Sequence, residues 1–308
     1  MNHAFGSAPE GVMSPPAVVL PGSDVFAARA QRLRDLSGRV EAMGEFLAFM
    51  AQVAQAQQVA LEQGVPDWQP EPEAFTLALE HGMAPLSVDA LRRDVDIPGE
   101  VMAFVDALDL HVGGAQRPLL EQLRRMPAEE RDALVAALLD GQPGPQASRG
   151  VMPLLAAALQ VAWVRLVQRL PDAPQRPPDE ARSICPSCGS APVASVIQDD
   201  PECRGARYLQ CGLCATQWYL ERARCSVCEH TGKLKYLSLE DDDGNPWLPV
   251  QAETCGNCNS YLKIMPRELD GKLETLADDL ASLALDLSLN EEGTFRRSGY
   301  NPLFIIGE

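Results

Sequence analysis

The sequence predicts an α + small β protein, in which an N-terminal all-helical domain is followed by two tandem rubredoxin-like or zinc-ribbon modules and a C-terminal helix. Three observations support this fold class. Apolar residues recur at helical spacing through the first half of the chain. All nine cysteines lie in one stretch of the second half, and eight of them form four Cys-x-x-Cys pairs. Leucines at helical spacing then follow the cysteines.

The first half is expected to be helical because proline and glycine separate segments with helical periodicity. Residues 1–22 contain four prolines and three glycines, so we interpret them as a flexible arm. Residues 23–170 form the helical domain, and its first helix is expected to run from Ser23 to Gly64 with one apolar stripe. Further helices are expected at 72–80, 87–94, 99–111, 115–125, 127–140 and 151–170.

The second half is expected to contain short strands between cysteine turns. Residues 171–182 hold four prolines and serve as a linker. Metal ribbon 1 is assigned to 183–223 and metal ribbon 2 to 224–265, while 266–308 hold the C-terminal helix and tail. The strands are expected within 191–197, 206–210, 216–224, 233–240 and 248–253. Asp278 and Asp279 are expected on the exposed face of the closing helix. The apolar residues of the tail are expected to dock on the body of the protein: Tyr300, Leu303, Phe304, Ile305 and Ile306.

Composition and charge exclude several classes of protein. The 308 residues are 46% hydrophobic and carry a formal net charge of −17, which disfavours binding to nucleic acid and to anionic lipid. Residues 182–265 contain eight basic and ten acidic residues, so the cysteine region also lacks the charge of a nucleic-acid-binding ribbon. Residues 151–167 are the most apolar stretch, but Gln160 and Arg165 predict a buried helix rather than a membrane span. The first twenty residues lack the pattern of a secretory signal, so a cytoplasmic location is expected.

The four Cys-x-x-Cys pairs are the most specific signal in the chain. Two thiolates three residues apart can bind one ion from a tight turn, and two such turns complete a tetrahedral shell of four sulfurs. Four pairs therefore predict two metal sites. Loop lengths favour pairing of consecutive turns, and a crossed pairing is the alternative. The proposed ligands are Cys185, Cys188, Cys211 and Cys214 in the first site and Cys225, Cys228, Cys255 and Cys258 in the second.

Other functions of Cys-x-x-Cys fit less well. A thioredoxin-like pair needs one such motif in a βαβ unit, haem attachment needs a histidine directly after the second cysteine, and ferredoxins have a denser run of cysteines. Mononuclear zinc or iron remains, and ligand chemistry alone favours structural zinc. The ninth cysteine, Cys203, lies near Arg204 and Arg207, which could activate its thiol, but a loop cysteine without a role is favoured. His230 is expected to be a solvated side chain rather than a ligand.

The chain shows no motif of a known catalytic site. It has no phosphate-binding loop, dinucleotide fingerprint, nucleophile elbow or metalloprotease helix, and it has only four histidines. We therefore expect neither catalytic nor organic-cofactor residues and do not predict an enzyme. A rubredoxin-like electron-transfer protein and a nucleic-acid-binding zinc-ribbon protein are the alternatives, the second disfavoured by charge.

The cysteine region resembles the FdhE family of formate dehydrogenase accessory proteins. The resemblance is carried by CPSCGSAPVASVI, RYLQCGLCATQWYLERARCSVCEHTGKLKYLSLED, AETCGNCNSYLKIM, ADDLASLALD and RRSGYNPLF. It implies a cytoplasmic maturation factor, or chaperone, needed for active respiratory formate dehydrogenase. It also implies binding to the catalytic subunit and its twin-arginine signal peptide before export. The resemblance further implies two rubredoxin-like iron sites per chain, which shifts the expected metal from zinc toward iron.

Overall fold

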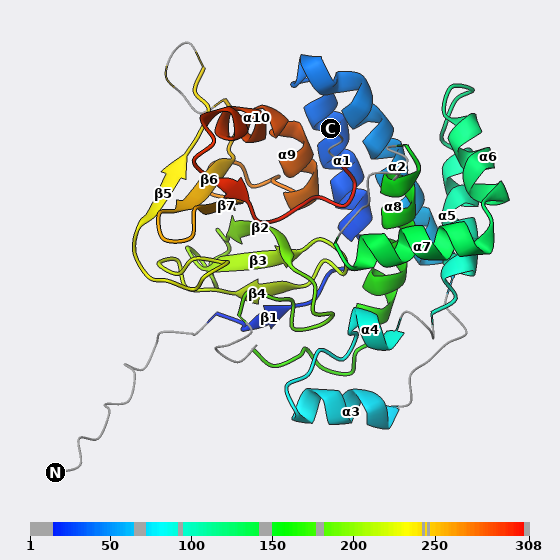
Figure 1. Ribbon diagram of the computed structural model, residues 1–308, viewed down its shortest axis with the longest axis horizontal. Coiled ribbons are helices and arrows are strands. Elements are labelled where there is room, and N and C mark those ends of the chain that lie inside the picture. Colours follow the sequence, from blue (N-terminus) through cyan, green and yellow to red (C-terminus); the bar gives the residue numbers. More distant parts are fainter. Residues whose placement is uncertain are drawn as a thin grey trace.

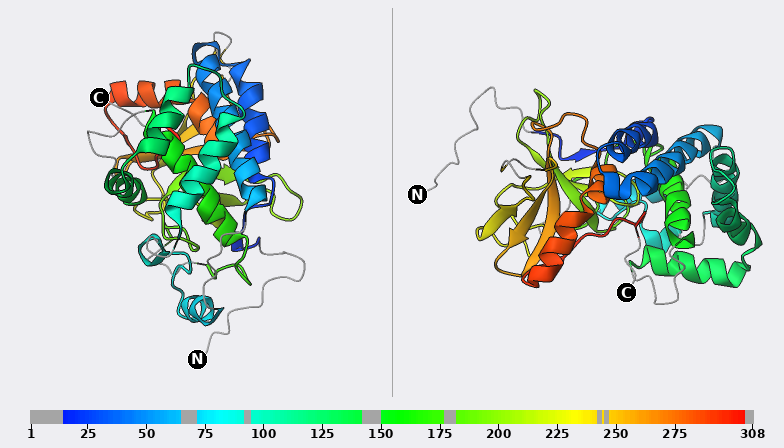
Figure 2. Two further views of the ribbon diagram at one scale, coloured as in Figure 1. Left: turned by 90° about the vertical axis from the view of Figure 1, so that its right-hand side faces the viewer. Right: turned by 90° about the horizontal axis from the view of Figure 1, so that it is seen from above.

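The N-terminal helices and the sheet occupy opposite sides of the molecule (Figure 1). The computed structural model describes residues 15–64, 72–91, 95–141, 150–176, 182–241, 244 and 247–304. Seen from above, the strands lie at one end, the N-terminal helices at the other, and the last two helices beside the sheet (Figure 2). This arrangement confirms the predicted fold class of a helical region followed by a region of small strands.

Helix α8 forms the centre of the helical region. Every residue of α8 is buried, and the helix packs against α2, α5, α6 and α7. Its Arg165 forms an ion pair with Glu100 of α5 and also donates to the carbonyl oxygen of Ala60, so its charge is compensated inside the core. Among the described residues, no helix is long and apolar enough to cross a membrane. The helices of this region are α1 Val25–Ser37, α2 Gly44–Gln63, α3 Pro72–Glu80, α4 Val88–Leu91, α5 Ile97–Asp109, α6 Arg117–Arg125, α7 Ala128–Leu139 and α8 Val151–Val167.

The prediction of one continuous helix from Ser23 to Gly64 is wrong. α1 ends before Gly38, a short 3-10 turn spans Glu41–Met43, and α2 begins at Gly44. Glycine is a poor helix former, and two glycines six residues apart allow the chain to reverse. The two helices then pack against each other, so the apolar stripe lines both sides of one interface. Its residues Leu33, Leu36, Leu47 and Met50 are all buried.

One sheet contains the strands of both cysteine modules. Its order is β1-β4-β3-β2-β7-β6-β5, with β8 paired to β7. The parallel pairing of β2 with β7 joins the two modules, whereas the neighbours within each module are antiparallel. The strands are β1 Val18–Val19, β2 Pro192–Ile197, β3 Arg207–Cys211, β4 Gln217–Tyr219, β5 Leu234–Leu237, β6 Gln251–Cys255, β7 Ser260–Pro266 and β8 Arg296–Arg297.

Three strands of this sheet were not expected: β1, β7 and the short β8, which lies in the tail and pairs with β7. β7 lies outside the five predicted strand runs, although it connects the modules and is buried along its whole length. β1 lies within the predicted arm, where Val18 pairs with Trp218 of β4. A two-residue strand has no recognisable period, so only its partner strand reveals it. Residues 1–14 of the predicted arm, 177–181 of the linker, and Asp242, Asp243, Ile305 and Ile306 lie outside the described residues.

The closing helix is divided, and its acidic residues are buried. α9 spans Thr275–Ala281 and α10 spans Leu283–Glu292, with Ser282 between them. The expectation that Asp278 and Asp279 lie on an exposed face is wrong, because their exposures are 0% and 2%. Asp278 pairs with Arg32 of α1, while Asp279 pairs with cations from β7 and β8. Cations from distant segments therefore compensate these buried carboxylates.

The interface of α1 with α9 is held by buried charges. Arg32 donates from Nη2 to Asp278 Oδ1 at 2.6 Å and from Nη1 to Asp270 Oδ2 at 2.8 Å. Arg29 donates from Nε to Glu274 Oε1 at 3.1 Å, and the other oxygen of Glu274 accepts from the N–H of Ala277 in the first turn of α9. Burial raises the pKa of Asp278 to about 6 despite the opposing hydrogen bonds and charge of Arg32. The acid is therefore costly to bury without its arginine.

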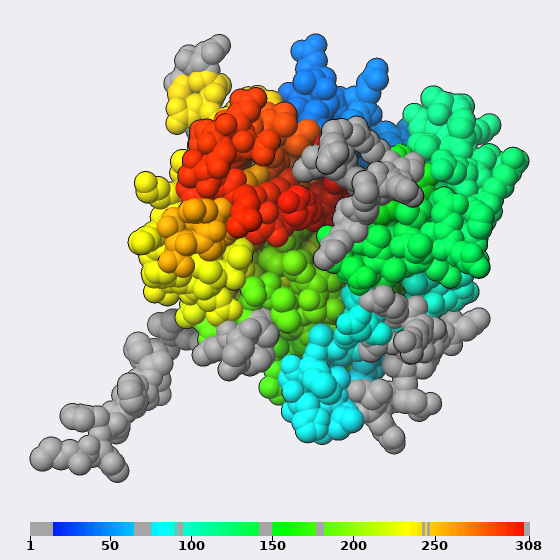
Figure 3. All heavy atoms as spheres, viewed as in Figure 1, coloured from blue at the N-terminus to red at the C-terminus, as the bar shows by residue number. Residues whose placement is uncertain are grey.

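The C-terminal segment packs back across the molecule, as its apolar residues predict. It runs over the face between the sheet and the helices (Figure 3). Leu303 is fully buried, and the ring of Phe304 meets that of Phe46 in α2 at a centroid distance of 5.7 Å. Tyr300 is an exception, because 62% of its surface is exposed.

We predict that Arg32→Met destabilises the protein by about 3–5 kcal/mol, because it leaves Asp278 buried without a cation. Arg34→Met on the exposed side of α1 is the matched control and should change stability by no more than about 0.5 kcal/mol. Urea unfolding followed by circular dichroism measures both values. Equal effects of the two substitutions would show that the α1–α9 ion pair is not what orients these helices.

Candidate metal centre

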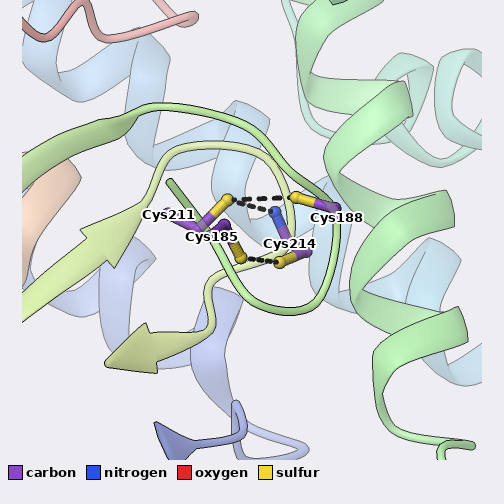
Figure 4. A group of neighbouring side chains, drawn as sticks. All are labelled: Cys185, Cys188, Cys211 and Cys214. Carbon is purple, nitrogen blue, oxygen red and sulfur yellow. Dashed lines mark hydrogen bonds between the residues drawn. The ribbon is translucent and has the colours of Figure 1, made fainter. Parts of the chain in front are cut away.

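The structure brings the eight paired cysteines together as two groups of four. Within each group the sulfur atoms all lie within 4.8 Å of one another. The first group joins Cys185 and Cys188 to Cys211 and Cys214 (Figure 4). The second joins Cys225 and Cys228 to Cys255 and Cys258. Consecutive turns are therefore paired, as loop length favours, and the crossed alternative is wrong.

The spacing of the sulfur atoms fits one metal ion with tetrahedral coordination. Four sulfurs placed 2.3 Å from a common centre would be about 3.8 Å from one another. In the first cluster Sγ–Sγ distances of 3.5 Å join Cys185 to Cys214 and Cys188 to Cys211. In the second cluster Cys225 and Cys258, like Cys228 and Cys255, are 3.8 Å apart. All nine cysteines are free thiols, so the donor set suits either zinc or iron.

Each cysteine turn uses a residue with positive φ directly after its second cysteine. These residues are Gly189, Ala215, Glu229 and Asn259, with φ between 54° and 80°. Gly212 and Gly256, which lie inside the second and fourth turns, are not among the positive-φ residues. The left-handed residue turns the chain back, so the N–H of Cys185 donates to the carbonyl of Ser190 and that of Cys225 to the carbonyl of His230.

Polar groups around the sulfurs favour the thiolate form at selected positions. Backbone N–H groups point at the first cysteine of three turns, including those of Leu213 and Cys214 at Cys211 Sγ, 3.4 Å away. Hydroxyls of Ser190, Thr216 and Ser260 lie 2.9–3.4 Å from cysteine sulfurs. Such contacts stabilise negative charge on sulfur.

The pKa values in each cluster are split. Burial raises the pKa of Cys185 well above its ordinary value and that of Cys225 to about 12. Burial has the same tendency at Cys228, but hydrogen bonds from the backbone of His230 and the amide of Asn257 prevail and lower its pKa to about 6. Burial also tends to raise the pKa of Cys188, but hydrogen bonds with the neighbouring cysteines prevail and hold this pKa well below its ordinary value. A cation is thus needed before all four thiols of a cluster ionise together.

The first cluster lies against the helical region. Gln160 of α8 donates from Nε2 to the carbonyl of Gly212, inside the turn of Cys211 and Cys214, at 2.6 Å. The N–H of Leu86 donates to the carbonyl of Ser187 at 2.7 Å, and the indole N–H of Trp163 donates to the carbonyl of Leu86. The predicted first module is therefore docked on the helices through its cysteine turns.

The second cluster lies next to β5, the last strand in the sheet order. Cys225 and Cys255 are buried, whereas Cys228 and Cys258 are partly exposed. The side-chain amide of Asn257 donates to Cys228 Sγ at 3.5 Å. Sequence analysis missed this contact, and the position of Asn257 between two ligands was the only signal for it.

Cys203 and His230 belong to neither group of four. Activation of the Cys203 thiol by arginine, the less favoured alternative, is not found: burial raises its pKa, and the charges of Asp200 and Glu202 raise it further. Arg207 instead forms a buried ion pair with Glu253. His230 is exposed, as expected for a solvated side chain, and only its backbone contributes to the second cluster.

Models of one family match nearly the whole described chain. The FdhE N-terminal domain matches residues 14–180, the FdhE central domain 184–222 and the FdhE C-terminal domain 223–304. The central and C-terminal matches each contain one complete cysteine cluster.

Curated relatives and a solved structure agree with these matches. The Protein FdhE homolog of Pseudomonas aeruginosa is 40% identical over 291 residues, which are 92% of this chain and 91% of that protein. Protein FdhE of Escherichia coli is 35% identical over 299 residues, covering 96% and 93% of the two chains. The crystal structure of the FdhE protein from Pseudomonas aeruginosa superposes with a TM-score of 0.82 at 36% identity and covers 95% of this chain and 100% of that one. The chain therefore belongs to the FdhE family.

Proposed function

We propose that this protein is an accessory factor needed for active respiratory formate dehydrogenase, and not itself an enzyme that turns over formate. The observation that carries this proposal is the combination of three FdhE domain matches with two complete four-cysteine clusters. In a Pseudomonas aeruginosa strain lacking its FdhE homolog, expression of this chain should restore formate dehydrogenase activity. Absence of activity despite soluble expression of the chain would contradict the proposal.

The eight paired cysteines are the proposed ligands of two metal ions per chain. Iron is the proposed metal, in line with the rubredoxin-like resemblance, and zinc is the alternative because four thiolates suit both ions. Either ion would neutralise part of the thiolate charge and crosslink two turns that are distant in sequence. The protein supplies the hydrogen bonds to sulfur and the apolar surroundings that hold these turns in place.

The proposed partner is the catalytic subunit of formate dehydrogenase in the cytoplasm, before its twin-arginine export. The net charge of −17 supports this partner because an acidic protein attracts an arginine-containing leader over long range.

Electron transfer by a rubredoxin-like protein is the second candidate function. The partial exposure of Cys228 and Cys258 favours it, since electrons reach a metal more readily near the surface. Reversible oxidation of bound iron would distinguish it from a purely structural centre.

We predict that Cys211→Ser and Cys258→Ser each lower the metal content from about two ions to about one ion per chain, because three thiolates bind these ions far more weakly than four. Elemental analysis of the purified variants measures this content. Cys203→Ser is the matched control, since Cys203 lies in neither cluster, and it should retain both ions. Unchanged metal content in the soluble Cys211→Ser and Cys258→Ser variants would show that the ligand assignment is wrong.

We also predict that the chain co-purifies with the catalytic subunit carrying its leader, and that recovery falls as salt is raised, because screening weakens attraction between exposed opposite charges. Replacing the two leader arginines with glutamine should lower recovery further. A complex that is insensitive to both changes would place the contact on the folded part of the partner rather than on its leader.

A further inference from the structure

The two four-cysteine clusters differ in how far solvent reaches their sulfur atoms. In the first cluster no cysteine exposes more than 1% of its surface. In the second cluster Cys228 and Cys258 are partly exposed. Val227, which lies between the two cysteines of the third turn, is 44% exposed, and Gly256 and Asn257 in the fourth turn are exposed as well.

Protein surrounds the first cluster on the side of the helices and on the side of the sheet. Helix α8 holds one of its turns through Gln160, and the segment before α4 holds the other through the N–H of Leu86. A groove of about 490 Å³ passes the turns at Gly189, Gly212 and Leu213, but the sulfurs behind this backbone remain buried. Release of an ion from this cluster therefore requires the turns to separate from the helices.

The second cluster lies at the edge of the sheet and needs no such separation. One of its turns directly precedes β5, which is the last strand in the sheet order, and the other connects β6 to β7. The turn of Cys225 and Cys228 lies between β4 and β5, outside the interior strands, so it can open while β6 and β7 stay paired and its ligands can exchange without unfolding of the core.

Exposed cations lie on the segment that carries the third cysteine turn and β5, although the protein as a whole is strongly acidic. In the segment 222–236, Arg224 forms ion pairs with Glu221 and Glu229, whereas three further basic residues face solvent. Arg222, Lys233 and Lys235 are exposed. The carbonyl of Lys233 accepts from the N–H of Gly256 at 2.9 Å, which fixes this lysine beside the fourth cysteine turn.

We infer that the second cluster is the chemically open metal centre and that its basic surroundings select anionic reactants, whereas the first cluster is a closed structural centre. This inference rests on the proposed binding of two ions. In the exchange step the four metal–thiolate bonds break and the oxygen and nitrogen ligands of an anionic chelator replace them. The ion keeps its oxidation state, and the released thiolates take up protons from solvent.

The rate at which metal leaves the full-length chain tests whether the second cluster is more open than the first. The protein is loaded with zinc, which undergoes no redox chemistry, and is treated with excess EDTA, while samples are alkylated with iodoacetamide and analysed by peptide mass spectrometry. One ion per chain should leave at least about tenfold faster than the other, because the second cluster opens locally and the first only with the core. Alkylation should appear first at the cysteines of the second cluster, and Cys203 serves as an internal reference because it lies in neither cluster.

The outcomes separate this inference from the proposed function. A chain that never binds two ions overturns the metal assignment and this inference together. Two ions that leave at one rate, or alkylation that appears first in the cluster of Cys185, overturn the inference alone. The labelling pattern needs no variant, so the test does not depend on the folding of a cysteine substitution.

The preference for anionic reactants is tested with a double variant, Lys233→Glu with Lys235→Glu. It should slow the fast phase of release to EDTA by about threefold or more at low salt, because two cations beside the cluster become anions that repel the chelator. Release to the uncharged chelator 1,10-phenanthroline should stay unchanged. Arg34→Glu with Arg125→Glu changes the net charge equally at a distance from the cluster and should affect neither rate. Equal slowing by both double variants would overturn the assignment of a basic entry surface.

Discussion

The structure depends on one buried amide, that of Gln160 in the middle of α8. Its Oε1 accepts from Arg29 of α1 at 3.1 Å and from Gln57 of α2 at 2.8 Å, while its Nε2 donates to the carbonyl of Gly212 in the first cysteine cluster. A buried amide without partners is costly, so this group requires one arrangement of the three helices and the cysteine turn. Arg29 extends the network to Glu274 at the start of α9. The helices, the first cluster and the C-terminal segment are thereby connected in one continuous polar network.

Buried ion pairs connect the remaining parts. Arg207 of β3 and Glu253 of β6 are almost fully buried and lie 2.7 Å apart, which joins the two cysteine modules across the sheet. Lys263 of β7 and Arg297 of β8 contact Asp279 and Asp286, and so attach α9 and α10 to the sheet. Desolvation offsets much of the attraction in such pairs, but an unpaired partner would be more costly still. We infer that their main contribution is to specify one arrangement of the modules.

These connections give the two cysteine clusters different surroundings. The first cluster lies where the helices, the sheet and the polar network meet, so an ion bound there would stabilise the whole molecule. The second cluster lies at the sheet edge, and two of its sulfur atoms belong to partly exposed residues. One protein can thus combine a centre that maintains the fold with a centre that reacts, provided that only the second is exposed to solvent.

The sequence by itself determined the features that depend on local spacing: the four Cys-x-x-Cys turns, the helix over Pro72–Glu80, and the buried helix that begins at Val151. The apolar spacing continues past Gly38 and Gly44 and therefore hid the break between α1 and α2. Local spacing also reports only on neighbours in the chain, so it could not show the central position of β7. The burial of Asp278 and Asp279 also depended on partners far away in sequence, since a carboxylate is buried only where a distant arginine or lysine meets it. The different exposure of two clusters with the same ligands was decided by the tertiary structure alone, because the helices pack against one cluster and leave the other at the edge of the sheet.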